Sequence, residues 1–185
     1  FTEGRLAAKA ACKYIDDGKA EGIVVSAAQL NRRRNEIYKP LEHYKTYRNA
    51  IVAGSVNPHY INPKQGLDRL QKLMDEYCGG VTVNYMTHEK LLHIGLKKLR
   101  ILEEDLESLR AKDLHELLRA WENYHRIITA EAHMKHIQFR EESRYPGFYY
   151  RTDKNFVDAE NWHCLVNSIY DKNTHKWTCF KRKHV

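Results

Sequence analysis

The sequence predicts a mainly α fold: a small helical bundle with a long α-hairpin and a C-terminal β-hairpin. Three observations carry this prediction. Leucines recur at helical spacing up to residue 109, a second long segment with helical periodicity runs from 113 to 139, and β-favouring residues flank a turn-like DKNT stretch after residue 161. Two long helices joined by a few residues pack antiparallel, and shorter helices can cover them as a bundle.

Two helices are predicted in the first quarter of the chain. Residues 2–18 are rich in alanine, begin with a threonine that can cap a helix, and end at Gly18. Ser26 can cap the next helical stretch, which passes through three consecutive arginines. Pro40 is expected to end or kink that helix, and helical residues continue up to Gly54.

The next predicted helix starts at Asn62, a cap residue followed by proline, and closes at Gly79. Residues 81–86 form a short bridge. Thr87 is then expected to open the first helix of the α-hairpin. Its apolar stripe consists of Leu92, Leu96, Leu99, Leu102, Leu106 and Leu109.

The second helix of the α-hairpin begins at a capping-box pattern, Asp113 with Glu116 three residues later. Apolar residues follow at spacings of three, four and their multiples, which predicts the face that enters the core. These residues are Leu114, Leu117, Leu118, Trp121, Tyr124, Ile128 and Phe139.

Composition limits the class of protein. Of 185 residues, 42% are hydrophobic, which is enough for one well-packed core. No apolar run approaches the roughly 20 residues of a transmembrane helix, and no secretory leader is visible. The four cysteines form no CxxC pair, so we expect reduced thiols in a cytoplasmic protein.

The net charge of +7 leaves open a second class of function, a stand-alone basic helical module that binds nucleic acid. Such a module would bind with an affinity that falls steeply as salt rises. Acidic residues are interleaved with the basic ones through the middle of the chain, as in LRILEEDLESLRAKDLHE. This pattern favours solvated helix faces, so we expect no nucleic-acid partner.

No candidate for catalysis or metal binding withstands comparison with known patterns. His133 and His136 are three residues apart on a predicted helix, but they belong to no HExxH motif and have no acidic or cysteine partner at a ligand spacing. His163 and Cys164 are adjacent, so on a strand they point to opposite faces. A glycine-rich phosphate loop and a GxSxG motif are also absent. We predict no catalytic residue and no metal site in this chain.

An unusual segment, REESRYPGFYYRTD at residues 140–153, follows the longest helix. Three arginines bracket four aromatic rings, and a Pro-Gly pair breaks the helix between them. One interpretation is structural: the aromatic strap, residues 144–153, wraps the bundle while Arg144 or Arg151 pairs with nearby carboxylates. The other is that aromatics and arginines face another domain or a nucleotide. The two are compatible if the strap lies at a domain boundary.

This segment, together with DAENWHCLVNS and YDKNTHKW, resembles the C-terminal region of the α subunits of dissimilatory adenylylsulfate reductases. More distant kin are the succinate dehydrogenase and fumarate reductase flavoproteins. The chain keeps the motif residues Glu142–Ser143–Arg144, Asp153 and Trp162. It has Tyr145–Pro146–Gly147 where those kin carry small residues and a histidine.

The start of the chain, FTEGRLAAKAA, is similar to the last helix of the flavin domain in this superfamily. The resemblance implies that Phe1, Thr2, Glu3 and Gly4 contribute to FAD binding, since a helix N-terminus presents unpaired N–H groups and partial positive charge. Most FAD-binding residues would lie outside this chain. The chain starts without methionine and directly in a helical pattern, so we expect it to be the C-terminal piece of a longer polypeptide.

By this resemblance the whole subunit reduces adenosine 5′-phosphosulfate to AMP and sulfite, or runs the reverse, through FAD. Iron–sulfur clusters would be confined to a partner β subunit, and other contacts would be made with upstream FAD-binding and capping domains. The fragment alone is expected to be inactive. Within it, Arg144 and Tyr145 are the candidates for substrate or domain contact. A fumarate reductase, succinate dehydrogenase or L-aspartate oxidase C-terminus is the alternative within the superfamily.

The resemblance also implies three regions. Residues 1–17 would be the last helix of the FAD-binding domain, residues 18–160 the helical C-terminal domain with the strap at 144–153, and residues 161–185 the β-hairpin tail.

Overall fold

The computed structural model describes residues 2–19, 22, 24–50, 57–144 and 150–183. It confirms the mainly helical class with a C-terminal antiparallel hairpin. The helices are α1 (Thr2–Asp16), α2 (Ala27–Tyr47), α3 (Pro63–Tyr77), α4 (Glu89–Leu106), α5 (Leu114–Phe139) and α6 (Ala159–Trp162), with a 3-10 turn η2 (Val81–Val83). The strands are β1 (Met86–Thr87), β2 (Tyr150–Arg151), β3 (Leu165–Asp171) and β4 (Lys176–Arg182).

The chain divides into two compact units within α2, residues Phe1–Ile37 and Tyr38–Val185. In the first unit, α1 ends as predicted beside Gly18, which has a φ of 66° that glycine adopts without strain. Ser26 caps α2, because its hydroxyl accepts from the Gln29 amide while the Gln29 side chain accepts from the Ser26 amide. No residue of α1 is buried.

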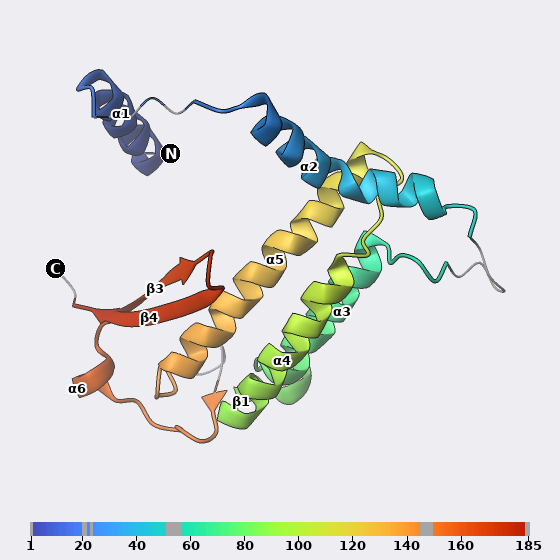
Figure 1. The fold of residues 1–185 in the computed structure, drawn as a ribbon. Coiled ribbons are helices and arrows are strands. Elements are labelled where there is room, and N and C mark those ends of the chain that lie inside the picture. The colour runs from blue at the N-terminus through green and yellow to red at the C-terminus, as the bar shows by residue number, and fades with distance from the viewer. Residues whose placement is uncertain (1, 20–21, 23, 51–56, 145–149, 184–185) are drawn as a thin grey trace. The chain divides into compact units, whose positions relative to one another are not determined.

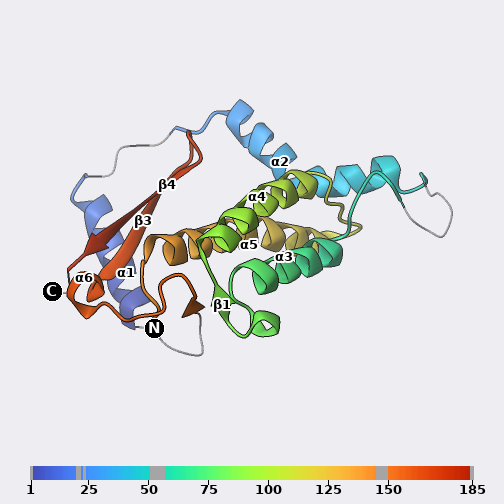
Figure 2. The same ribbon diagram turned by 90° about the horizontal axis from the view of Figure 1, so that it is seen from below.

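The second unit holds the core, in which α3 packs beside the antiparallel pair α4 and α5 (Figures 1 and 2). All six leucines of the stripe predicted between 92 and 109 are buried. The core cluster consists of Leu70, Leu73, Cys78, Leu92, Leu96, Leu99, Leu102, Leu106, Leu109, Ala120, Ile127, Ala130, Met134 and Ile137.

The predicted core face of α5 was partly wrong. Leu114, Leu118 and Ile128 are 69%, 57% and 45% exposed, while the small residues Ala120 and Ala130 are buried. Apolar residues lie on two sides of this helix, so periodicity alone did not decide which side packs. The buried side carries large residues such as Ile127 and Met134 together with these alanines, whose small side chains let α5 approach its neighbours closely.

Two predicted helix boundaries and one predicted capping box need correction. Pro40 does not end α2, which continues to Tyr47, short of the expected Gly54, a residue outside the described part. Thr87 does not open α4: it lies in β1, and His88 is the N-cap, with Nδ1 accepting from the Leu91 amide at 3.3 Å. Only the first half of the expected box at Asp113 forms, since the Glu116 side chain accepts from Lys112 instead.

The other boundaries agree with prediction. Asn62 and Gln65 form a complete capping box at the start of α3, with proline at the first helical position. Just past the end of α3, Gly79 has a φ of 82°. At the C-terminus, β3 and β4 pair antiparallel around the DKNT turn and lie against α5.

Candidate functional site

The candidate site consists of residues 140–144 and 150–154, which flank the undescribed part of the strap and lie where α5 ends and α4 begins. Glu142 lies at the centre of the first group, with a fully buried side chain. Its carboxylate accepts from Arg140 Nη1 at 2.6 Å and from Arg144 Nε and Nη2 at 2.6 and 2.9 Å. It also accepts from the Asp158 amide at 2.8 Å. One carboxylate therefore serves two arginines, and the trio carries a net positive charge.

Arg151 is the second anchor of the strap and is 1% exposed. Its Nε and Nη2 donate to both carboxylate oxygens of Asp153 at 2.9 and 2.7 Å. Nη1 donates to the backbone carbonyls of Ile137 and Gln138, which belong to the last turn of α5 and have no helical partner. Nη2 also reaches Glu89, in the first turn of α4, at 3.2 Å. This arginine therefore joins the ends of two helices and the strap.

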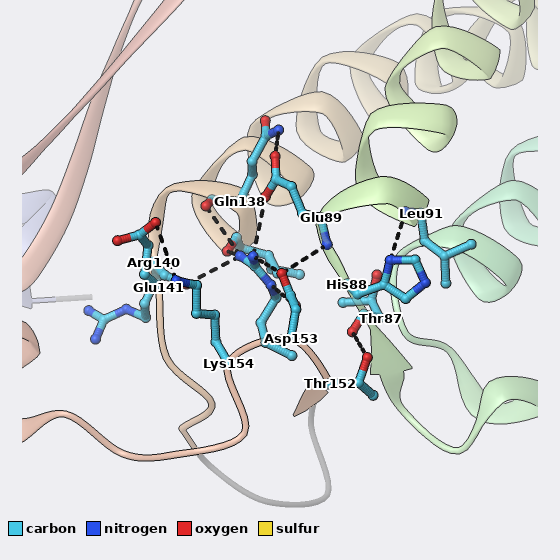
Figure 3. Close-up of polar contacts among 12 residues, drawn as sticks. Thr87, His88, Glu89, Leu91, Gln138, Arg140, Glu141, Thr152, Asp153 and Lys154 are labelled. Carbon is cyan, nitrogen blue, oxygen red and sulfur yellow. Dashed lines mark hydrogen bonds and ion pairs between the residues drawn. The ribbon is translucent and has the colours of Figure 1, made fainter.

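Figure 3 shows Glu89, Gln138 and Asp153 converging where α4 begins and α5 ends. Asp153 accepts from the Glu89 amide, an unpaired N–H of the α4 N-terminus, at 3.2 Å. Gln138 donates to the Glu89 side chain. The negative charges of the cluster thus lie at a helix N-terminus and the positive charge of Arg151 at a helix C-terminus, as the helix dipoles favour.

Backbone hydrogen bonds complete the attachment of the strap. β1 and β2 pair in parallel, with Thr87 opposite Arg151, and the Thr152 amide donates to the Thr87 carbonyl at 2.9 Å. The Ser143 hydroxyl accepts from the Arg151 amide at 2.8 Å and donates to the Lys154 carbonyl at 2.8 Å. The two anchors are therefore linked through a buried serine.

The electrostatics of both anchors favour the charged forms. Hydrogen bonding from Arg151 lowers the pKa of Asp153 from 3.8 to about 2. Burial raises the pKa of Glu142, but hydrogen bonds from Arg144, from the Asp158 amide and from Arg140 outweigh it, so the pKa lies below 4.5. Both carboxylates are ionised at neutral pH and act as fixed acceptors. Proton transfer is not a role that their pKa values favour.

The predicted site residues lie in two different units. Thr2, Glu3 and Gly4 are exposed in the first turn of α1, in the first unit. Arg144 lies in the second unit and is held by Glu142. Phe1 and Tyr145 lie outside the described residues, so their predicted contacts stay predictions. The structural interpretation of the strap is confirmed for both Arg144 and Arg151, since each pairs with a carboxylate.

Sequence reasoning missed Glu142 and Glu89 as partners. The alternation of charge in Arg140, Glu142 and Arg144 was a signal that Glu142 pairs with the two arginines. Glu89 pairs with Arg151, 62 positions later in the chain, a separation that no local spacing reveals.

The described residues offer no second candidate site. Across those ranges, no group of three or more His, Cys, Asp and Glu side chains could hold a metal ion. His136 Nε2 lies 2.9 Å from Ser168 Oγ, a contact between α5 and β3. Burial lowers the pKa values of both His133 and His136, as expected for helix residues covered by a packed neighbour. None of the described helices is long and apolar enough to cross a membrane.

Comparison with known proteins adds to this geometry. The family described as fumarate reductase flavoprotein C-term matches residues 67–185. The adenylylsulfate reductase subunit alpha of Megalodesulfovibrio gigas is 46% identical over 185 residues, covering 98% of this chain and 27% of that protein.

Two solved structures are similar over the whole chain. They are the adenylylsulfate reductase of the hyperthermophile Archaeoglobus fulgidus and an adenosine-5-phosphosulfate reductase in complex with sulfite as a covalent adduct. Each has a TM-score of 0.92 and 48% identity, and covers 100% of this chain and 28% of the other. The chain thus spans just over a quarter of the length of these relatives.

Proposed function

The chain belongs to the fumarate reductase flavoprotein C-terminal family, and we propose that within this family it is the C-terminal helical part of the flavoprotein α subunit of an adenylylsulfate reductase. The whole subunit would reduce adenosine 5′-phosphosulfate to AMP and sulfite, or run the reverse. The observation that carries the proposal is 46–48% identity to adenylylsulfate reductases over essentially the whole chain. A fumarate reductase, succinate dehydrogenase or L-aspartate oxidase remains the less favoured alternative.

The role proposed for this helical part of the subunit is to position a neighbouring domain or the substrate. The described residues hold two buried charged anchors and several backbone hydrogen bonds that attach the two ends of the strap, Arg144 and residues 150–153, to the bundle. Within this network, the Arg144 guanidinium donates to both carboxylate oxygens of Glu142, at 2.6 and 2.9 Å. Such an arginine presents a fixed positive charge to a neighbouring domain or to an anionic substrate. We expect the isolated fragment to be inactive.

The residues present fit a flavin at the N-terminus of α1. The first four N–H groups of a helix have no acceptor within the helix. Gly4 carries no side chain, and no neighbouring atom lies within 4 Å of the position that a Cβ would take there, so nothing in the described residues obstructs this turn. Glu3 carries negative charge in the same turn, so the donors to a flavin carbonyl would be backbone N–H groups of Thr2, Glu3 and Gly4. When bound, FAD would supply the electron transfer that none of the described side chains provides.

The proposal includes a protein partner and a location. An iron–sulfur β subunit would exchange electrons with the flavin, and the FAD-binding and capping domains would complete the α subunit. The four cysteines are free thiols, which supports a reducing compartment such as the cytoplasm.

The test is to produce the subunit with its native preceding sequence, together with its iron–sulfur partner. We expect a visible flavin spectrum, bleaching of that spectrum by sulfite, and AMP-dependent sulfite oxidation. The 185-residue chain alone should show none of these. A correctly folded full-length subunit that contains no flavin would contradict the proposal, and reduction of fumarate in place of adenosine 5′-phosphosulfate would favour the alternative.

Nucleic-acid binding is tested separately. A gel-shift titration with the same preparation should show no tight complex at physiological salt. Tight binding that weakens steeply with added salt would instead support the basic-module hypothesis.

A further inference from the structure

Two side chains of the last turns of α5 attach the β3–β4 hairpin to the bundle. His136 Nε2 lies 2.9 Å from Ser168 Oγ, and this hydrogen bond joins α5 to the middle of β3. Both residues are partly buried. Arg140 Nη2 donates to the carbonyl of Cys164, the residue before β3, at 3.0 Å. One contact therefore holds the start of the hairpin and the other holds its middle.

The two attachments lie on the same face of α5. His136 and Arg140 are four residues apart, and side chains at this spacing are neighbours on a helix. Arg140 is always positively charged, and two like charges at this spacing destabilise a helix. A protonated His136 would place a second positive charge beside Arg140, in a partly buried contact where a charge is also poorly solvated.

No negative charge is placed to compensate a protonated His136. Among the described residues, this imidazole forms no ion pair with a carboxylate. Glu142 already accepts from two arginines, one of which is Arg140. Glu131, five residues before His136 on α5, lines a separate pocket with Tyr170 and the hairpin turn.

The end of α5 also has its cation already. A helix C-terminus favours positive charge, and Arg151 supplies it by donating to the carbonyls of Ile137 and Gln138. The other charged or titratable groups around the contact are basic or neutral at physiological pH. They are His133 and Lys135 on α5, and Lys181 and the Cys179 thiol on β4, where Cys179 is the register partner of Ser168.

The sign of the pH dependence follows from these surroundings. Burial, and after it the charge of Arg140, lowers the pKa of His136 below 6.5. The folded protein thus favours the neutral imidazole. The contribution of this residue to stability is complete above the ordinary histidine pKa of 6.5 and is lost progressively as the pH falls below it.

We propose that the contact between His136 and Ser168 is a pH-sensitive attachment, which holds the β3–β4 hairpin on α5 at neutral pH and releases it on mild acidification. The proton enters on the His136 imidazole, and the hairpin opens locally. The buried leucines of α4 do not contact this pair through an ionisable group, so the core stays folded. The attachment lies within the second unit and does not depend on the proposed reaction or on the flavin.

Hydrogen exchange followed by mass spectrometry, on the full-length α subunit, measures this opening. Exchange is corrected for the pH dependence of its intrinsic rate. Peptides covering residues 165–182 should then open about threefold more, or beyond that, at about pH 5.5 than at about pH 7.5. Peptides of α3 and α4 should change by less than about twofold. His136→Gln keeps an amide that can bond to Ser168 and cannot be charged, so its hairpin should show little response to pH.

Two further variants separate this contact from its surroundings. His175→Asn is the matched control, because it removes a histidine of the same hairpin whose Nδ1 contacts Tyr170 at 3.0 Å and not α5. Asparagine tolerates the φ of 52° at that position, and this variant should respond to pH as the parent does. Ser168→Ala removes the partner of the imidazole, so its hairpin should open more than the parent's already at about pH 7.5.

Several outcomes would overturn the inference. The contact is not pH-sensitive if the parent hairpin exchanges equally at both pH values, or if His136→Gln responds as strongly as the parent. Loss of the response in His175→Asn alone would assign it to the hairpin turn. Should His136→Gln fail to fold, Ser168→Ala still decides, because exchange equal to the parent's at neutral pH would show that the contact does not hold the hairpin. A subunit without flavin or sulfite reactivity contradicts only the proposed function.

Discussion

Replacing Glu142 by glutamine tests whether the buried carboxylate holds the strap. The change keeps the shape of the side chain and removes its charge, which leaves Arg140 and Arg144 side by side without their shared acceptor. Removing one partner of a buried ion pair costs about 3–5 kcal/mol. The side chains of Arg140 and Arg144 are 17% and 22% exposed, so water can solvate them in part. We therefore expect a loss near the lower end, about 3 kcal/mol.

The assay is urea and thermal unfolding of the chain, followed by far-UV circular dichroism. For a chain of this size, a loss of about 3 kcal/mol lowers Tm by roughly 6–12 °C. The neighbouring residue supplies a matched control: Glu141 is 63% exposed and only 3.8 Å from Lys154, so Glu141→Gln should cost less than about 0.5 kcal/mol. Adding Arg144→Met to Glu142→Gln should recover part of the loss, because it removes the uncompensated charge.

The reasoning is refuted if Glu142→Gln is no more destabilising than Glu141→Gln. It is also refuted if the added Arg144→Met substitution makes the protein less stable by its full single-variant cost. Additive costs would mean that Glu142 and Arg144 do not interact in the folded protein.

Three further predictions concern other parts of the second unit. Because the pKa of Asp153 is lowered from 3.8 to about 2, its contribution is complete above about pH 4 and is lost as the pH falls toward 2. Asp153→Asn should lower the free energy of unfolding at pH 7 by at most about 2 kcal/mol and flatten its acid dependence, as urea titrations at several pH values will show. Asn62→Ala removes half of the capping box with Gln65 and should cost about 1 kcal/mol in urea unfolding. Gly80→Ala should cost about 1–3 kcal/mol in the same assay, because its Cβ would overlap Asp75.

Each of these predictions has its own contradicting result. If the free energy of unfolding of Asp153→Asn falls with acid pH as steeply as that of the parent, Arg151 does not stabilise the ionised Asp153 carboxylate. An Asn62→Ala variant as stable as the parent would mean that the cap contributes nothing. Gly22→Ala, whose added Cβ meets nothing within 4 Å, is the control for Gly80→Ala, and equal costs would exclude a steric cause.

The parts of the fold that follow local rules were predictable from sequence. The leucine stripe before residue 109 is buried throughout, and the starts of α2 and α3 follow from cap residues whose side chains close on the nearby amides. These predictions succeed because one periodicity or one side chain decides them. Pro40 was expected to end or kink its helix, and it does not end it: the buried proline lies inside α2, and its carbonyl accepts from the Ala111 amide, 71 residues later in the chain.

The candidate site was predictable only in part. The motif around Glu142 and Arg144 marked the segment, and the expectation that its arginines pair with carboxylates is confirmed. The link from Arg151 to Glu89 depends on how the α-hairpin closes, which brings the end of α5 beside the start of α4. Sequence also could not choose the buried side of α5, because Leu118 and Leu117 fit helical periodicity equally well. Tertiary packing makes that choice.

The two-ended attachment of the strap sets how force passes through this part of the molecule. Arg151 donates hydrogen bonds both to a terminal carbonyl of α5 and to Glu89 in the first turn of α4. The parallel pairing of β1 with β2 adds backbone hydrogen bonds at the same place. A neighbour that pushes on the strap must therefore displace the tips of both long helices. A partner that binds where α4 begins and α5 ends would therefore meet a backbone that changes little between the free and the bound protein.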